Sequence, residues 1–290
     1  MTAPGLRLVL GTADLRDDSL TPRLLDQFYD AGGRAIDVAN VYGGGESERA
    51  VGKWLRGRGV GPVLYAKGCH PPSCRPDLVA GEVEAALESL GADRLDVFML
   101  HRDDPSVDIR AWSDALLEQL RRGTVDSIGV SNWTPERFFA LRDCLHELGE
   151  ERVTVFSNHF SLATMAEPPW PACLATDAPT AARIAASGIT VLAWASLAGG
   201  YLADGGNTNP SVLRSWDTES NRLRRARAAK LAERLGTTTA TIALAYVFAH
   251  EGVRPIVGTR SHDHLSEALA AEGVELTPEQ LAELEADGRA

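Results

Sequence analysis

Four side chains of complementary chemistry stand at the ends of successive apolar runs in this chain of 290 residues. Asp37 and Tyr42 bracket the end of one run, and Lys67 ends the next. His101 ends the run after that. A free phenol has a pKa of about 10, and a neighbouring ammonium favours the phenolate and lowers that value. A carboxylate can hold the ammonium in place, and a histidine can orient a carbonyl oxygen. The set could therefore give a proton to the alkoxide that forms when hydride reaches a carbonyl.

Each of these residues also has an ordinary explanation. Lys67 could be a solvated lysine, Asp37 could cap the following turn, and His101 could be a surface histidine with satisfied hydrogen bonds. The argument for chemistry is that all four occur at successive strand ends. In a closed parallel barrel these ends meet at one mouth, where residues far apart in sequence converge.

The apolar pattern predicts such a barrel. Eight short β-rich runs alternate with longer segments of helical spacing, such as 77–90 before Gly91 and 108–122 before Gly123. Strands are predicted at 6–12, 34–39, 63–68, 94–101, 126–132, 152–158, 189–196 and 254–259. Because these runs are apolar on both faces and each is followed by a helical segment, we predict a single-domain (β/α)8 TIM barrel over residues 1–290.

Two segments interrupt the alternation. Residues 159–179 are rich in proline, and residues 197–221 are rich in Gly, Asn and Ser. Both would follow barrel strands at the C-terminal face, where long loops are commonly functional. We predict that they form walls of the pocket.

The composition limits the cellular setting and the partners. The net charge of −11 argues against nucleic acid and anionic membrane, which both need a basic face. No apolar run approaches the roughly 20 residues of a membrane span, and no signal pattern opens the sequence, so a cytoplasmic location is expected. Cys69, Cys74, Cys144 and Cys173 match no disulfide framework. Cys69 and Cys74, with His70, could suggest zinc, but no second pair follows them, and no metal is expected.

Several segments resemble a known family. They are DVANVYGGGESERAVGKWL (37–55), AKG (66–68), LESLGADRLDVFMLHRDD (87–104), RRGTVDSIGVSNWTPERF (121–138), ITVLAWASLAGGYL (189–202) and IALAYVFAHEGVRPIVGTRSHDHLSEAL (242–269). Over nearly its whole length the chain is similar to the aldo-keto reductases. The resemblance implies a TIM barrel that binds NADPH, less often NADH, without a Rossmann domain. It also implies that Tyr42 is the general acid, that Lys67 and Asp37 tune it, and that His101 orients the substrate.

The resemblance assigns cofactor contacts as well. Ser131 and Asn132 match the pair that holds the nicotinamide carboxamide, and Asp37 would also approach the nicotinamide ribose. Trp194 stands where an aromatic side chain stacks on the nicotinamide ring, and Ser157 replaces the usual glutamine. The further contacts implied are Gly11, Thr12, Ser196, Leu197, Gly258 and Thr259.

The site for a 2′-phosphate departs from the family pattern. Arg260 follows the last strand, but His264 stands at the position of a later arginine and Ala268 at that of an asparagine. Arg260 and the helix start at Ser261 can still bind a phosphate. NADPH is therefore expected as the cofactor, with NADH the less favoured alternative.

Arg102, Trp133 and Trp170 are expected to shape the substrate site with the two long loops. The segment NHFSLATMAEPPWPAC (158–173) is similar to a subgroup of bacterial sugar-type oxidoreductases. We therefore predict an NAD(P)H-dependent oxidoreductase that reduces an aldehyde, ketone or keto-sugar to an alcohol. Nothing in the sequence demands assembly, so a monomer or a weak homo-oligomer is expected.

Three other functions remain open. A sugar or polyol dehydrogenase working in the oxidising direction would use the same residues, with Tyr42 as the base. A metal-dependent hydrolase could use Asp37, His101, His159 and His262, but the first strand ends in GTADL rather than His-x-His. A non-catalytic barrel that senses the cofactor is the third, although the four candidate residues are all present.

Overall fold

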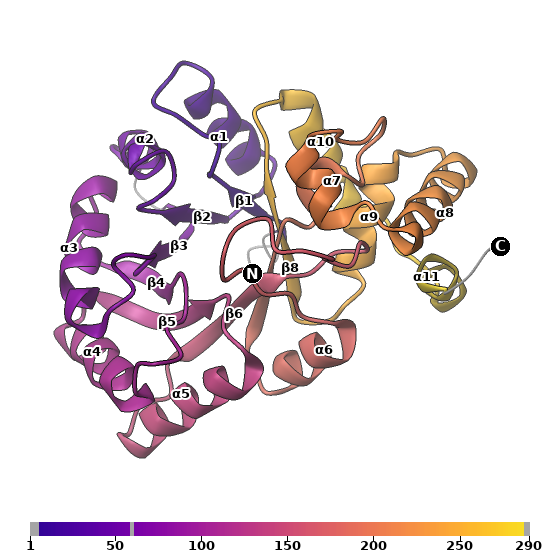
Figure 1. Ribbon diagram of the computed structural model, residues 1–290. Coiled ribbons are helices and arrows are strands. Elements are labelled where there is room, and N and C mark those ends of the chain that lie inside the picture. Colours follow the sequence, from indigo (N-terminus) through magenta and orange to yellow (C-terminus); the bar gives the residue numbers. More distant parts are fainter. Residues whose placement is uncertain (1–5, 59–60, 287–290) are drawn as a thin grey trace, which may run out of the picture.

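The computed structural model describes residues 6–58 and 61–286. Eight parallel strands close into a barrel in chain order, with β1 pairing both β2 and β8 (Figure 1). The strands are β1 (Val9–Gly11), β2 (Ala35–Ala39), β3 (Val63–Gly68), β4 (Leu95–Leu100), β5 (Val125–Ser131), β6 (Val153–His159), β7 (Thr190–Trp194) and β8 (Val253–Gly258). The predicted (β/α)8 fold is confirmed, and each strand lies within the range predicted from the apolar pattern or extends it by one residue.

Helices surround the barrel (Figure 1). They are α1 (Thr21–Asp30), α2 (Glu46–Leu55), α3 (Val79–Leu90), α4 (Ile109–Arg122), α5 (Pro135–Glu147), α6 (Ala178–Ala186), α7 (Pro210–Trp216), α8 (Glu219–Leu235), α9 (Thr239–Phe248), α10 (His262–Ala270) and α11 (Pro278–Glu285). Short 3-10 turns cover Pro76–Leu78, Ala198–Gly200 and Ala271–Gly273. None of the helices described combines the length and apolar character that a membrane span requires.

The predicted helix limits rest on recognisable end signals. The side chain of Asp108 accepts a hydrogen bond from the Arg110 amide at 2.8 Å, which satisfies a free donor at the start of α4. Gly123 ends α4 and Gly91 ends α3, both in the left-handed conformation that glycine adopts without strain. The helices predicted at 77–90 and 108–122 are therefore confirmed.

The two long connections differ from each other. Residues 197–221 are not a plain loop, because they contain α7 and the start of α8. Asn209 caps α7 with Pro210 at its first position, and Thr218 caps α8, signals that a Gly- and Asn-rich composition obscures. The proline-rich segment after β6 carries no helix before α6, and an isolated bridge joins His159 to Ala175.

The core has two layers, and strand alternation sorts residues between them. Inside the barrel lie Val9, Ala35, Tyr65, Val97, Met99, Val155, Leu192 and Ile256. The intervening strand residues pack outward against the helices. Side chains two apart on a strand share a face, so Asp37 follows Ala35 and Lys67 follows Tyr65 toward the barrel interior. His101 continues the inward set of Val97 and Met99 by one further step, just past the end of β4.

Candidate active site

Asp37 joins the half-buried Tyr42 and the buried Lys67 in one cluster at the strand ends. The Tyr42 hydroxyl donates to Asp37 Oδ2 at 3.1 Å, and the Lys67 ammonium pairs with Asp37 Oδ1. The side chains of Lys67 and Asp37 are 3% and 2% exposed, so the ion pair is almost free of water. Lys67 Nζ also lies 5.1 Å from the centroid of the Tyr42 ring. The structure therefore brings together three of the four residues predicted from strand ends.

Local backbone structure fixes the approach of Tyr42. Its amide donates to the Ala39 carbonyl at 3.0 Å, which turns the chain back immediately after β2. Gly43, Gly44 and Gly45 follow with positive φ angles, a conformation that side chains disfavour, and lead into α2. The glycine triplet thus lets the chain turn sharply enough for a residue just outside the strand to reach Asp37 within it.

A short chain of hydrogen bonds holds the backbone of Asp37. Ser47 Oγ donates to Thr12 Oγ1 at 2.6 Å, and Thr12 Oγ1 donates to the Asp37 carbonyl at 2.8 Å. Thr12 is fully buried. Its hydroxyl is committed to this chain, so Thr12, which was predicted to contact the cofactor, holds the β1–β2 junction in the structure.

His101 lies beside the cluster. Its ring lies edge-on to the Tyr42 ring, with 6.0 Å between the two centroids. It is also edge-on to the His70 ring, with 5.0 Å between centroids. Nδ1 of His101 is buried without a hydrogen-bond partner. Burial, and then the charge of Lys67, holds the pKa of His101 well below its usual value, so the ring is neutral at physiological pH. A neutral imidazole can still orient a carbonyl oxygen by a hydrogen bond.

The electrostatics of Tyr42 differ from the sequence-based expectation. Burial raises the pKa of Tyr42 well above its usual value, and the charge and hydrogen bond of Asp37 raise it further. Burial also lowers the pKa of Lys67, although Asp37 opposes this. Burial outweighs the expected lowering of the phenol pKa by Lys67 in this structure, and the lysine charge is also paired with the carboxylate that the phenol contacts.

Ser131, Asn132 and Ser157 lie at the ends of β5 and β6. Asn132 Nδ2 donates to Ser131 Oγ at 3.0 Å, and Asn132 Oδ1 accepts from the Leu174 amide at 3.1 Å. The predicted carboxamide contact of Asn132 is thus partly occupied, since its side chain anchors the proline-rich segment to β5. Ser157 Oγ is buried without a partner and stays available.

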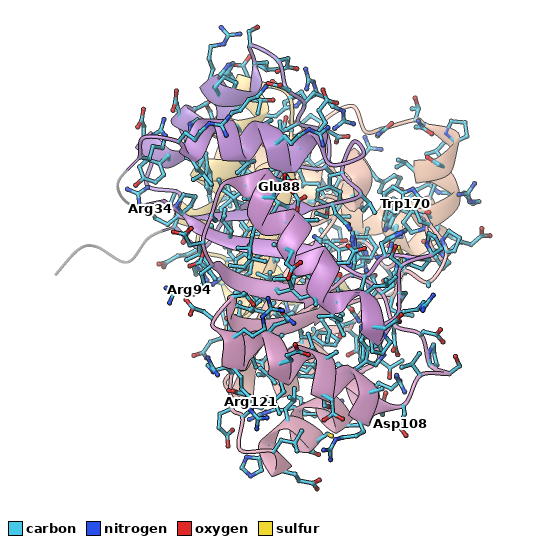
Figure 2. The ribbon with its side chains drawn as sticks, turned by 90° about the vertical axis from the view of Figure 1, so that its left-hand side faces the viewer. Arg34, Glu88, Arg94, Asp108, Arg121 and Trp170 are labelled. Atoms are coloured by element: carbon cyan, nitrogen blue, oxygen red, sulfur yellow. The ribbon has the colours of Figure 1, made fainter. Side chains whose placement is uncertain are left out.

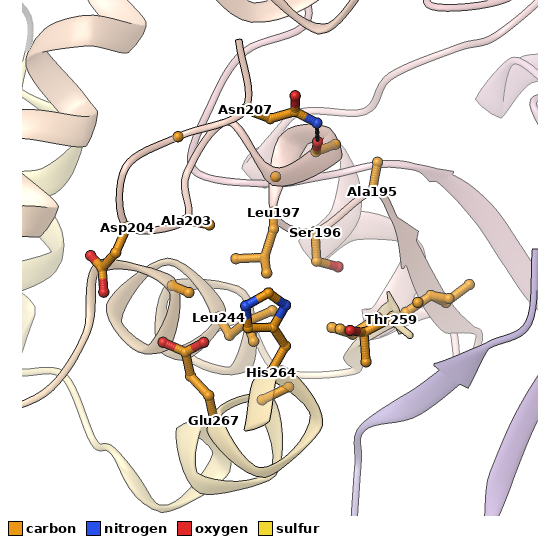
Figure 3. Close-up of a pocket in the computed structure, with 18 of the residues that line it drawn as sticks. Ala195, Ser196, Leu197, Ala203, Asp204, Asn207, Leu244, Thr259, His264 and Glu267 are labelled. Carbon is orange, nitrogen blue, oxygen red and sulfur yellow. Dashed lines mark hydrogen bonds between the residues drawn. The ribbon is translucent and has the colours of Figure 1, made fainter. Parts of the chain in front are cut away.

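A cavity of about 580 Å³ opens at the ends of β7 and β8, beside α9 and α10, and its lining does not include Asp37, Tyr42, Lys67 or His101 (Figure 3). Five predicted cofactor residues line it: Ser196, Leu197, Gly258, Thr259 and His264. In Figure 3 the His264 ring and the Glu267 carboxylate enter the cavity from α10, while Leu197 and Asp204 lie on its other side. The first part of the 197–221 segment therefore forms a wall of the cavity, as predicted, whereas its lining includes no residue of 159–179.

Sequence reasoning missed several lining residues, among them Asp14, Asp204, Asn207, Leu244 and Glu267. Asn207 Nδ2 donates to the Gly199 carbonyl at 2.9 Å and fixes the fold of its loop (Figure 3). Leu244 belongs to α9, whose residues are all buried, so its sequence shows no polar face that could mark a site. For the loop residues, the Gly- and Asn-rich composition of 197–208 is the sequence feature that could have indicated a cavity wall.

Eight predicted cofactor residues lie outside the cavity lining: Thr12, Asp37, Ser131, Asn132 and Ser157, described above, and Arg260, Gly11 and Trp194. Arg260 pairs with Asp18 at 2.6 Å and donates to the Asp14 carbonyl at 3.1 Å. Gly11 packs against Ile256, where a Cβ would come within 2.9 Å of a methyl group. Trp194 packs on the apolar cluster inside the barrel, and its Nε1 is buried without a partner.

The two predicted substrate residues separate in the structure. Arg102 directly follows His101 and is 5% exposed. Trp133 is fully buried in the core and packs edge-on against Trp112 with 6.3 Å between centroids. Its expected contact with substrate is not supported, because its indole faces the helix layer. Trp133 instead supports the site through its carbonyl, which accepts from Asn158 Nδ2 at 2.9 Å.

The residues present fit a nicotinamide dinucleotide. Four buried polar atoms without a protein partner lie at the ends of β4, β6 and β7: His101 Nδ1, Ser157 Oγ, Asn158 Oδ1 and Trp194 Nε1. Buried polar atoms normally have partners, and a carboxamide and a ribose offer both donors and acceptors. The cavity continues from Ala195 at the end of β7 to His264 on α10, which gives room for an extended ligand. In the described part of the chain, no three His, Cys, Asp or Glu residues are grouped to hold a metal.

Comparison with known proteins identifies the family. A sequence model described as "Aldo/keto reductase family" matches residues 7–287. The chain belongs to the aldo/keto reductase family. This membership places it among the oxidoreductases of carbonyl compounds.

Individual relatives in the aldo/keto reductase family are distant. An aldo-keto reductase of Fusarium vanettenii is 26% identical over 93% of this chain and 82% of its own length. The norsolorinic acid reductase of Emericella nidulans is 27% identical, covering 90% of this chain and 70% of that protein. An aldo-keto reductase of Klebsiella pneumoniae, solved in complex with NADPH, aligns with a TM-score of 0.75 at 23% identity, over 97% of this chain and 90% of the other.

Proposed function

We propose that this aldo/keto reductase reduces the carbonyl of an aldehyde, ketone or keto-sugar to an alcohol, with Tyr42 as the proton donor and NADPH as the hydride donor. The observation that carries the proposal is the contact of the Tyr42 hydroxyl with Asp37 at 3.1 Å, inside the buried Asp37–Lys67 pair. A phenol held in this way lies at the mouth of the barrel, next to a neutral histidine that can orient a carbonyl.

The roles of the chain's own residues follow from their contacts. Tyr42 holds a proton on Oη and gives it to the alkoxide oxygen as that oxygen forms. An alkoxide is a much stronger base than a phenolate, so a phenol of raised pKa can still protonate it. Lys67 then lies 5.1 Å from the ring that has become anionic and stabilises it by its charge. His101 positions the carbonyl oxygen before transfer.

NADPH, when bound, supplies the hydride. We propose that Asp37, Ser131, Asn132, Ser157 and Trp194 surround its nicotinamide end, and that the cavity between 195–208 and α10 takes its adenosine end. Known structures of the family, including one in complex with NADPH, support this cofactor. Thr259, His264 and Arg260 are the candidates for the 2′-phosphate, and Arg260 would exchange its present partner Asp18 for it. NADH remains the less favoured alternative.

The raised pKa of Tyr42 favours reduction over oxidation of an alcohol. In the oxidising direction Tyr42 must first be a phenolate, and burial together with Asp37 opposes that state. In the reducing direction the protonated form is the active one, and it is present throughout the physiological range.

The test is the Tyr42→Phe variant. We expect its rate of carbonyl-dependent NADPH oxidation to fall by at least about a hundredfold, because no other acid replaces the phenol. NADPH affinity, measured by fluorescence titration, should change little. Tyr246→Phe is a matched control, since the Tyr246 hydroxyl donates to Glu285 at 2.7 Å on the far side of α9. An unchanged rate in Tyr42→Phe would disprove the role of Tyr42, and NADPH binding without turnover of any carbonyl would favour a cofactor-sensing protein.

A further inference from the structure

Arg102 is a buried arginine that has no carboxylate partner. It follows His101 at the end of β4 and is 5% exposed. The ion pairs found among the described residues do not include it. Its acidic neighbours are committed elsewhere: Asp37 pairs with Lys67, and Asp103 pairs with Arg137 at 2.6 Å. A buried cation without a counter-ion is costly, so its presence needs an explanation.

The hydrogen bonds of Arg102 leave most of its donors free. Nη1 donates to the His101 carbonyl at 2.8 Å, and Nη2 donates to Cys173 Sγ at 3.3 Å, while Nε is buried without a partner. A guanidinium carries five N–H donors, and both acceptors used here are neutral. Burial raises the pKa of the Cys173 thiol, so it does not serve as a thiolate counter-ion.

Arg102 lies at the reacting end of the site, because it directly follows His101 and its Nη1 donates to the His101 carbonyl at 2.8 Å. Its charge acts on Tyr42, Lys67 and His101: burial is the main cause of their pKa shifts, and Arg102 adds a downward influence on each. The ion pair of Lys67 and Asp37 is neutral as a whole and His101 is uncharged, so Arg102 gives the site a net positive charge. The whole protein has a net charge of −11, which makes this local excess unusual.

The proline-rich segment covers Arg102 from one side. Cys173 accepts its hydrogen bond, and Leu174 is tied to Asn132. Trp170, three residues before Cys173, is 63% exposed and lies on the same side of the molecule as Asp108, well apart from it (Figure 2). Arg102 keeps a small exposed fraction similar to the 6% of His101, which a substrate must also reach.

We infer that Arg102 binds a carboxylate of the substrate, and that the substrates of this reductase are therefore oxo acids, aldehydes or ketones that carry a carboxylate group. The planar guanidinium fork matches a carboxylate with two parallel hydrogen bonds. Such a ligand would supply the counter-ion that the protein lacks and use the free N–H groups. The inference rests on the proposed carbonyl reduction and adds the class of substrate.

The experiment compares each oxo acid with a neutral aldehyde of equal length, such as succinic semialdehyde with butanal and 4-carboxybenzaldehyde with 4-methylbenzaldehyde. For the wild type we expect kcat/KM to favour at least one oxo acid by about tenfold or more, mainly through KM. Arg102→Met should lower kcat/KM for the oxo acid by about tenfold more than for the neutral aldehyde and so remove the preference, while Arg102→Lys keeps part of it. Arg110→Met is the control, because Arg110 is an exposed arginine paired with Asp114 on α4.

Binding without turnover gives an independent measurement. Calorimetry in saturating NADP⁺ should detect succinate binding to the wild type and to Arg110→Met, and much weaker succinate binding to Arg102→Met. The neutral compound butyramide should not bind detectably to any of the three proteins. Equal kcat/KM for the two members of every pair in the wild type, or equal losses for both members in Arg102→Met, would overturn the inference. If Arg102→Met does not fold, the wild-type preference and Arg102→Lys decide the matter. Absence of NADPH oxidation with every aldehyde would instead reject the proposed function, while succinate binding would still test Arg102.

Discussion

At the scale of single residues, the site depends on two charges that compensate each other. Lys67 and Asp37 are almost fully buried, so each has lost its hydration and relies on the other. Asp37 also contacts the proton donor, because its other oxygen accepts a hydrogen bond from the Tyr42 hydroxyl. The carboxylate therefore both balances the lysine and keeps the phenol protonated until a stronger base arrives.

This pairing predicts different effects of single and double substitutions. Lys67→Met should lower the free energy of unfolding by about 3–5 kcal/mol, because it leaves the Asp37 charge buried and unpaired. The double variant Lys67→Met with Asp37→Asn should recover most of that stability but none of the activity. Urea denaturation and NADPH oxidation measure the two effects. A double variant as unstable as the single one would show that the charge of Asp37 is not the cause.

At the scale of elements, α2 packs unusually close to α3. A Cβ added at Gly52 on α2 would stand 2.3 Å from the Ser89 carbonyl and 2.8 Å from Leu90 Cα, both backbone atoms of α3. Only glycine permits this distance. Because α2 follows directly on the Tyr42–Gly45 turn, the close packing of the two helices also fixes the C-terminal end of the segment that carries the proton donor.

Gly52→Ala should therefore destabilise the protein by about 1–3 kcal/mol, because the two helices must separate. Gly81→Ala is a matched control on α3, where a Cβ would meet nothing within 4 Å. The control should stabilise by up to about 1 kcal/mol, since alanine is the better helix former. Thermal unfolding measures both, and similar values for the two variants would contradict the close-contact explanation.

At the scale of the whole molecule, folding buries an acid that has one unpaired oxygen. Glu48 is 1% exposed, and its Oε1 has no hydrogen-bond partner. Burial, and then the charge of Glu82, raises its pKa from 4.5 to about 7. Between these two values the folded chain keeps a proton that the unfolded chain releases. The stability contributed by Glu48 is thus complete below pH 4.5 and is lost as pH rises to about 7.

We predict that Glu48→Gln removes this part of the pH dependence. The free energy of unfolding of the wild type should fall by an amount on the order of 3 kcal/mol between about pH 4.5 and 7 through this group, and the neutral isostere should not show that fall. Urea denaturation across this range measures it. If the free energy of unfolding depends on pH in the same way in both proteins, a group other than Glu48 is responsible for the titration.

Local sequence patterns were enough to predict the barrel and the residues at its mouth. Strand alternation and helix spacing are local, so the eight strands and the ends of α3 and α4 could be read from the residues. The strand ends of a parallel barrel meet at one mouth, so the barrel topology alone predicts that Asp37, Lys67 and His101 lie together. The short helix α7 was missed because its capping residues stand in a segment with loop composition.

The environment of each side chain, in contrast, depends on the folded structure. Trp133 lies in the core, Arg260 is paired with Asp18, and Asn132 holds the proline-rich segment, none of which a linear pattern encodes. The direction of the Tyr42 pKa shift also depended on which neighbour is nearest and on how much water remains. Burial and Coulomb interactions depend on distances between segments far apart in the chain, and those distances exist only once the barrel has closed.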